Sequence, residues 1–110
     1  MTLKELMKIS NSTAKKKGWW DKGERNFGEL IALCHSELSE ALEDYRHGRS
    51  LSEIFYESDG KPCGIPTEIA DLLIRVADMC EAYNIPIEEA LKIKLAYNEG
   101  RPYRHGNKKA

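Results

Sequence analysis

The stretch Leu30–Tyr45, LIALCHSELSEALEDY, decides the fold of this chain. Read as an α-helix at about 100° per residue, it gathers eight apolar side chains into one broad stripe. The stripe consists of Leu30, Ile31, Leu33, Cys34, Leu38, Ala41, Leu42 and Tyr45. Apolar residues at this spacing are typical of a helix that packs one face against a protein core.

Two glutamates interrupt this stripe. Glu37 projects into its middle, and Glu40, one turn further on, lies at its edge. A carboxylate that points into a core costs several kcal/mol unless it is paired, protonated or bound to a cation. The pattern therefore predicts that a positive charge faces Glu37.

Three further segments have helical spacing, so four main helices are expected, at about 2–17, 26–46, 66–83 and 86–98. Asn26 is suited to cap the second helix, with Glu29 three residues later, and Gly48 ends it. The segment 47–66 is rich in Gly, Ser, Asp and Pro. We expect it to be a long surface connection whose apolar part, 51–56, forms one or two helical turns.

No segment shows sustained strand alternation, so the predicted fold is all-α. We expect an antiparallel helical bundle of four main helices in a single domain, residues 1–110, with a basic tail at about 100–110. The core of such a small bundle is modest. Association into a dimer or tetramer is therefore expected, because it would bury further apolar surface.

Composition narrows the possible partners. The net charge is -1, with 32% charged and 41% hydrophobic residues, which provides no general attraction to a nucleic-acid polymer or an anionic membrane. No apolar run reaches the about 20 residues of a membrane helix, and the N-terminus lacks the hydrophobic segment of a signal peptide. We expect a cytoplasmic protein. Its three cysteines form no CxxC pair, and Cys34 and Cys80 lie on apolar stripes, which indicates buried reduced thiols.

The third predicted helix carries a second pair of acids, Glu68 and Asp71, again at the flank of an apolar stripe. If the second and third helices are antiparallel, both acid pairs can converge. Four carboxylates in one place repel one another unless a divalent cation lies among them. Oxygen ligands without a matched His or Cys favour Mg²⁺ or Mn²⁺ over Zn²⁺, and His35 points to another side of its helix.

Two other interpretations compete with a metal site. Each acid pair could form salt bridges to neighbouring helices, which is the usual fate of helical carboxylates. His35-Ser36-Glu37 together with Pro62-Cys63 partly matches the signature of zinc deaminases. The second cysteine of that signature is missing and the necessary strands are absent from the pattern, so we exclude it.

Taken together, three motifs resemble the MazG-like all-α nucleoside triphosphate pyrophosphohydrolases. They are ExxE at Glu37 and Glu40, ExxD within EIADLLIRVADMCEAYNI, and KIKLAYNEGRPYRHGNK near the end. The similarity covers roughly residues 18–108. It implies a Mg²⁺-dependent dimer or tetramer of helical bundles that cleaves a nucleotide between its α- and β-phosphates, releasing a monophosphate and pyrophosphate.

The resemblance also assigns roles to individual residues. It implies that the metal ligands are Glu37, Glu40, Glu68 and Asp71. It implies that nucleotide-binding residues are Lys94 and Asn98, with the tail residues Arg101, Arg104 and Lys108 as further candidates. Trp19 and Trp20 occupy the region of base-contacting aromatics, although they could instead fill the core between helices.

The leading functional hypothesis is metal-assisted hydrolysis of a nucleoside triphosphate, with Glu37 or Glu40 as the general base. It makes the chain an enzyme that removes non-standard or surplus nucleotides. The alternative is a non-catalytic helical module for dimerisation or partner binding, in which the acids form interhelical salt bridges.

Overall fold

Four long helices account for most of the chain, and the computed structural model describes all residues 1–110. The helices and strands are α1 Leu3–Lys16, α2 Phe27–Arg46, β1 Phe55–Tyr56, β2 Pro62–Cys63, α3 Ile65–Ala82, α4 Ile87–Glu99 and α5 Arg104–Asn107. The predicted helical fold and its four main helices are confirmed, with bounds that differ by a few residues. The Asn26 side chain caps α2 as expected, because it accepts a hydrogen bond from the Glu29 backbone N–H at 2.9 Å.

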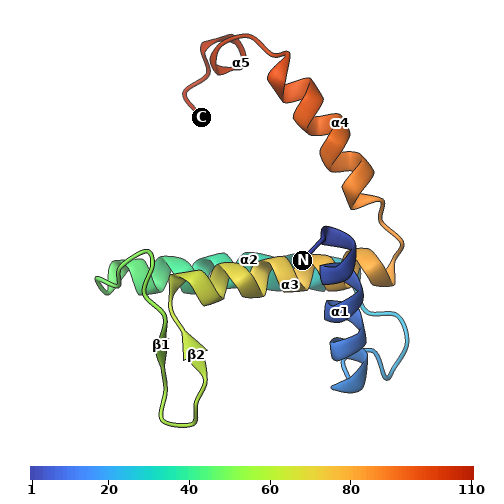
Figure 1. The fold of residues 1–110 in the computed structure, drawn as a ribbon, viewed down its shortest axis with the longest axis vertical. Helices are drawn as coiled ribbons and strands as arrows, with labels where there is room; N and C mark the ends of the chain where they lie inside the picture. Colours follow the sequence, from blue (N-terminus) through green and yellow to red (C-terminus); the bar gives the residue numbers. More distant parts are fainter.

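The centre of the molecule is the antiparallel pair α2 and α3, which lie side by side (Figure 1). Where the N-terminal half of α2 meets the C-terminal half of α3, Leu30 and Cys34 pack against Met79 and Cys80. Helix α1 crosses the pair at this end and adds Met7 to the cluster. The apolar stripes found in the sequence form this core only in part, because Leu38 and Leu42 of α2 and Leu73 of α3 remain about half exposed.

A buried polar network fastens α1 to α3. The carboxylate of Asp78 accepts hydrogen bonds from the Asn11 side-chain amide at 2.9 Å and from the Trp20 indole N–H at 3.0 Å. Asn11 and Asp78 are both buried. Trp20 also packs edge-on against Tyr83, at 5.8 Å between ring centroids. The network joins α1, the segment after it and α3 at one point.

The connection between α2 and α3 contains a short β-hairpin, so the helical turns predicted for 51–56 are wrong. Phe55 pairs with Cys63 and Tyr56 with Pro62 in antiparallel register. Aromatic residues favour strands, and Gly60, with φ of +89°, turns the chain between the two strands. The hairpin projects from the α2/α3 pair on the same side as α1 (Figure 1).

Gly64 joins the hairpin to α3 and so sets the position of the first turn of this helix. Its φ is +122°, a value that side-chain-bearing residues rarely adopt. A Cβ atom at this position would clash with the carbonyl oxygen of Glu53. The tight approach places the hairpin directly beside the first turn of α3, which contains Glu68.

Helix α4 does not complete a bundle within the chain, and this part of the predicted architecture is wrong for a single copy. It leaves the end of α3 through a turn at Asn84, whose φ is +54°, and extends away from the other helices (Figure 1). None of its residues is buried. The radius of gyration, 16.7 Å, exceeds the about 13 Å of a compact domain of this length.

All three cysteines, Cys34, Cys63 and Cys80, are buried and free, which confirms the expected reduced thiols. No helix of the chain combines the length and the apolar character needed to cross a membrane.

Candidate metal centre and adjoining cleft

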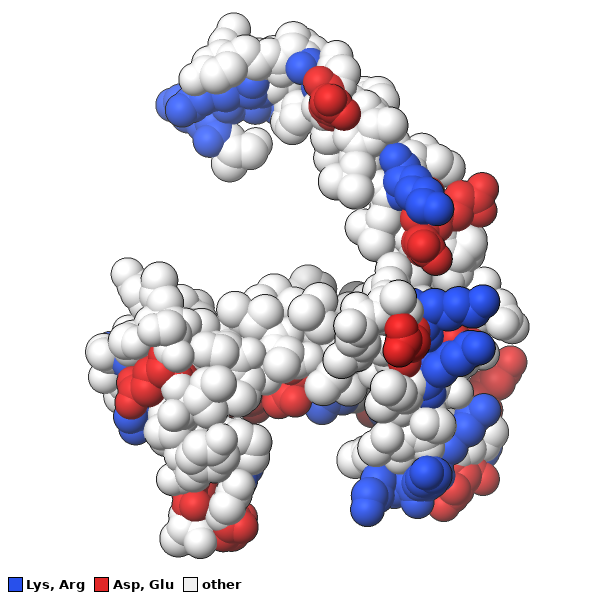
Figure 2. Space-filling model, viewed as in Figure 1, with Lys and Arg blue, Asp and Glu red and all other residues white.

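Three carboxylates from two helices meet on the α2/α3 pair. Glu37 and Glu40 of α2 and Glu68 of α3 each place an oxygen within 4.8 Å of the others. Residues three apart share one face of a helix, and the antiparallel arrangement of α2 and α3 turns the two acid-bearing faces to the same side. Acidic atoms gather below the helix pair, between the hairpin and α1 (Figure 2). We call these three residues the acid cluster.

Glu37 is the most deeply buried member of the cluster, with 6% of the residue exposed. Its Oε1 accepts a hydrogen bond from the Nε of Arg75 at 2.7 Å. Arg75, on α3, thus supplies the positive charge that the sequence predicted opposite Glu37. The other oxygen of Glu37, Oε2, is buried and has no hydrogen-bond partner.

Glu68 also has a buried oxygen without a hydrogen-bond donor facing it. Burial, followed by hydrogen bonding and charge repulsion from the carboxylate of Glu40 and by hydrogen bonding to Glu37, raises the pKa of Glu68 from its ordinary value of 4.5 to about 8. Asp71 lies outside the 4.8 Å group but is influenced by it. Burial and then the charge of Glu37 raise the pKa of Asp71, while Arg75 opposes the rise. The arrangement thus favours either an extra proton or a cation among the acids.

A cleft of about 520 Å³ opens beside the cluster, between α1 and the α2/α3 pair. Glu37, Asp71 and Arg75 lie at its wall together with apolar side chains of α1 and Ile74 of α3. The cleft also contains cations from outside α3, namely Lys17 and Arg25. An apolar hollow with basic groups beside carboxylates has the chemical character of a site for an anionic organic molecule.

One of the two tryptophans packs in the core and the other lines the cleft. Trp20 packs against the core and donates to Asp78. Trp19 lines the cleft and is 64% exposed, with the Arg25 guanidinium 5.6 Å from its ring centroid. Trp19 is therefore available to a ligand, whereas Trp20 is not.

A second hollow, of about 310 Å³, lies on the hairpin side of the cluster. Glu40 and Glu68 line it with Glu57, Lys61 and Cys63 from the hairpin. The thiol of Cys63 donates to Glu57 Oε1 at 3.2 Å. The acid cluster thus stands between a cleft against α1 and a smaller, more acidic hollow beneath the hairpin.

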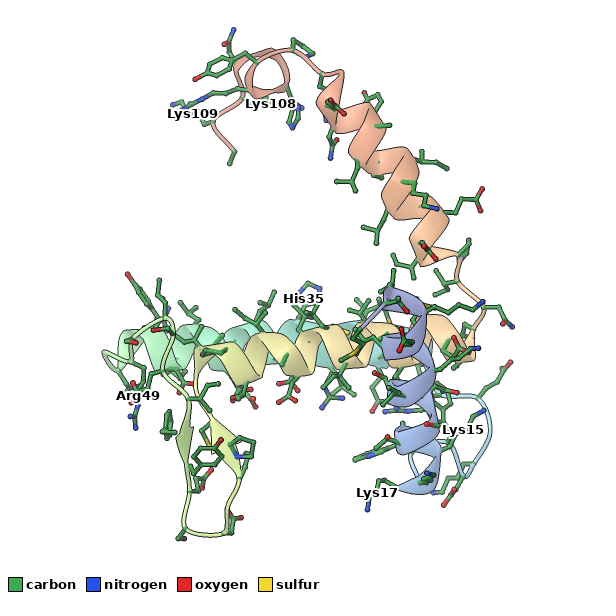
Figure 3. All side chains as sticks on the ribbon, viewed as in Figure 1. Lys15, Lys17, His35, Arg49, Lys108 and Lys109 are labelled. Carbon is green, nitrogen blue, oxygen red and sulfur yellow. The ribbon has the colours of Figure 1, made fainter.

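The residues expected to bind nucleotide from the C-terminal part are not brought to the cluster within one chain. Lys94 and Asn98 lie on α4, on the other side of the α2/α3 pair from the hairpin (Figure 1). The tail residues Arg101, Arg104 and Lys108 continue in the same direction, and Lys108 lies at the far end of the molecule (Figure 3). None of the five lines either hollow. His35 points away from the hairpin, consistent with its predicted place off the site.

Two residues of this region were missed in the sequence, Arg75 and Asp78. Both continue the face of α3 that carries the acids, because Glu68, Asp71, Arg75 and Asp78 are spaced by three, four and three residues. This polar spacing beside an apolar stripe was the available signal.

Comparison with known proteins does not assign the chain to a group, since no family model, curated protein or solved structure matches it.

Proposed function

We propose that this chain is a Mg²⁺-dependent nucleoside triphosphate pyrophosphohydrolase that converts an NTP or dNTP and water into the monophosphate and pyrophosphate. Its biological role would be the removal of non-standard or surplus nucleotides. Two lines of support meet here: the resemblance to MazG-like enzymes, and the buried, unpartnered oxygen of Glu37 among acids from another helix. The second observation carries most weight: Arg75 meets only one oxygen of Glu37, and the other lies buried among carboxylates, an arrangement that favours a further cation or a shared proton.

The donor set fits magnesium. Glu37, Glu40 and Glu68 would hold the ion, with Asp71 beside them, and all their ligand atoms are carboxylate oxygens. Oε2 of Glu37 and Oε2 of Glu68 are buried without a partner, and both would be available to the ion once Glu68 releases its proton. Bound there, Mg²⁺, or Mn²⁺ in its place, supplies charge to balance phosphate oxygens and lowers the pKa of a coordinated water.

The cleft beside α1 suits the nucleoside part of the substrate. Its about 520 Å³ falls in the range of about 300–1,000 Å³ typical of small-molecule sites. Trp19 offers an exposed aromatic face on which a base can stack, and Lys17 and Arg25 lie in the same cleft for phosphate oxygens.

The two glutamates of α2 differ in their suitability as general base. Glu37 is buried and tied to Arg75. Glu40 belongs to the same cluster but is exposed to solvent, so a water molecule can reach its carboxylate. We therefore assign proton transfer to Glu40 and a purely ligand role to Glu37.

We further propose that the active form is a homodimer or homotetramer. Helix α4 has no buried residue, although it carries exposed Leu91, Ile93 and Leu95. On the α2/α3 pair, Leu38 and Leu73 are also about half exposed. Packing these faces against a second copy would bury them, and would give Lys94 and Asn98 of α4 a route to a site on the partner.

A pyrophosphate-release assay tests the function. The chain is incubated with Mg²⁺ and a panel of ribo- and deoxyribonucleoside triphosphates, with EDTA as the control. We expect release from at least one nucleotide and none in EDTA. The exposed helix faces equally suit a non-catalytic partner-binding module, so an assembled protein that releases no pyrophosphate from any nucleotide would identify that module instead.

A further inference from the structure

We infer that Arg75 orients Glu37 through its Nε and offers its two terminal guanidinium nitrogens to a phosphate group of the substrate. The inference rests on the proposed function and adds a positioning and substrate-binding residue to it. Arg75 lies within the stretch EIADLLIRVADMCEAYNI that supports the resemblance, but the resemblance assigns no role to it.

The first role follows from the ion pair. The 2.7 Å separation between Arg75 Nε and Glu37 Oε1 is that of a strong charge-assisted hydrogen bond. With Oε1 occupied, the carboxylate is held so that Oε2 remains for the cluster, where it is buried and lacks a partner. Carboxylates that bind metals are commonly fixed by such an outer hydrogen bond.

The second role follows from what the rest of the guanidinium does. Arg75 makes no other hydrogen bond or ion pair in the chain, so both terminal nitrogens retain their donors. Its side chain is 39% exposed, against 8% for the side chain of Glu37, and it lines the cleft beside α1. A planar fork of free donors, open to a cleft and next to carboxylates, matches the geometry of a phosphate group.

Other arginines of the molecule do not combine these properties. Arg25 lies over the rings of Trp19 and Trp20 and pairs with no acid. Arg46 pairs with Glu43 at 3.7 Å near the end of α2 and lines neither hollow. Arg46 is thus a matched control, because it is an arginine in an ion pair with a glutamate away from the cleft.

The orienting role is tested without nucleotide, by titrating the whole chain with Mn²⁺ in a calorimeter. We expect Arg75→Gln to weaken Mn²⁺ binding by about 10- to 100-fold, as is usual when an outer-shell partner is removed. Arg46→Gln should bind Mn²⁺ as the unaltered chain does. Arg75→Lys keeps the charge that Glu37 requires, so it serves if the glutamine variant does not fold. We expect Arg75→Lys to weaken Mn²⁺ binding less than Arg75→Gln does.

The phosphate contact is tested by kinetics at saturating Mg²⁺. Arg75→Lys should raise KM for the nucleotide about tenfold while kcat changes less, because a lysine lacks the planar fork. Folded Arg75 variants that match the unaltered chain in both Mn²⁺ affinity and KM would overturn the inference alone. An unaltered chain that binds no Mn²⁺ and releases no pyrophosphate would overturn the proposed function, and the inference with it.

Discussion

Helices α3 and α4 follow each other in the chain and both carry apolar residues at helical spacing, yet only α3 is packed. Helix α3 lies between α1 and α2 and contributes Met79 and Cys80 to the core. Helix α4 has no buried residue. The comparison teaches that periodicity identifies which side chains share a face, whereas it does not identify the surface that covers the face.

The same contrast divides the proposed site. The acids of α2 and α3 meet within one chain because their helices pack directly against each other. The nucleotide-binding residues expected on α4, Lys94 and Asn98, have no such support. In the proposed enzyme, the metal-binding half of the site is complete in one copy and the α4 half requires a second.

The largest expected effect concerns the metal-binding half of the proposed site. Glu40→Gln and Asp71→Asn should each lower turnover by more than about 100-fold, because the first removes a metal ligand that also transfers the proton and the second removes a carboxylate beside the bound ion. The helical circular dichroism spectrum should be unchanged. His35→Ala, on the opposite face of α2, is the control. Full activity in either acid variant would contradict the assignment.

Asp78 lies further along the face of α3 that carries the acids, and we expect it to matter for stability rather than for turnover. Asp78→Ala leaves the Asn11 amide and the Trp20 indole without their shared acceptor. We expect the free energy of unfolding to fall by about 3 kcal/mol, measured by chemical denaturation. Asp71→Asn should change it by less than about 0.5 kcal/mol. Equal destabilisation by the two substitutions would remove the distinction between the two ends of the face.

A charged residue introduced on α4 tests whether this helix packs against a second copy of the chain. Leu95 is 65% exposed in the single chain, so Leu95→Glu should leave the fold of one copy intact. In the proposed oligomer the same glutamate would be buried, and the assembly should dissociate. Light scattering coupled to gel filtration measures the mass, with Lys92→Glu on the exposed α4 as a control. An unaltered mass and activity would show that α4 needs no partner.

The last expected effect is on stability as a function of pH. Because the pKa of Glu68 is raised from 4.5 to about 8, its proton is retained in the folded chain and lost in the unfolded one between these values. Stability is therefore greatest below about pH 4.5 as far as this group is concerned, and it falls as the pH rises through about 8.

Thermal unfolding in EDTA measures this dependence. The Tm should decrease between about pH 5 and about pH 9, and Mg²⁺ should restore it at the upper end. Glu68→Gln should make the profile flatter. A Tm that rises over this range in EDTA, with no response to Mg²⁺, would contradict the proposed environment of Glu68.

Much of the fold was accessible from the sequence because it depends on local signals. Apolar spacing and the Asn26 cap place α2 within about a residue of its observed start. The hairpin was missed because two-residue strands are too short for a pattern of alternation to appear. The direction of α4 was missed because apolar spacing does not identify the surface against which a helix packs.

The candidate site was predictable to a similar extent. The position of Glu37 on an apolar stripe required a cation nearby, but the sequence did not identify Arg75 as that cation, because an ion pair between helices depends on their register. The separation of Trp19 from Trp20 also depends on packing, since Asp78 must be in place to accept from one indole and not the other. Helical spacing predicted which acids share a face, whereas the residues that contact them depend on how the helices pack.

Anomalous X-ray scattering from a crystal of this chain grown with Mn²⁺ tests the central claim most directly. The account predicts a manganese peak among the carboxylate oxygens of Glu37, Glu40 and Glu68. A peak elsewhere, or none at a concentration of Mn²⁺ that supports catalysis, would contradict it.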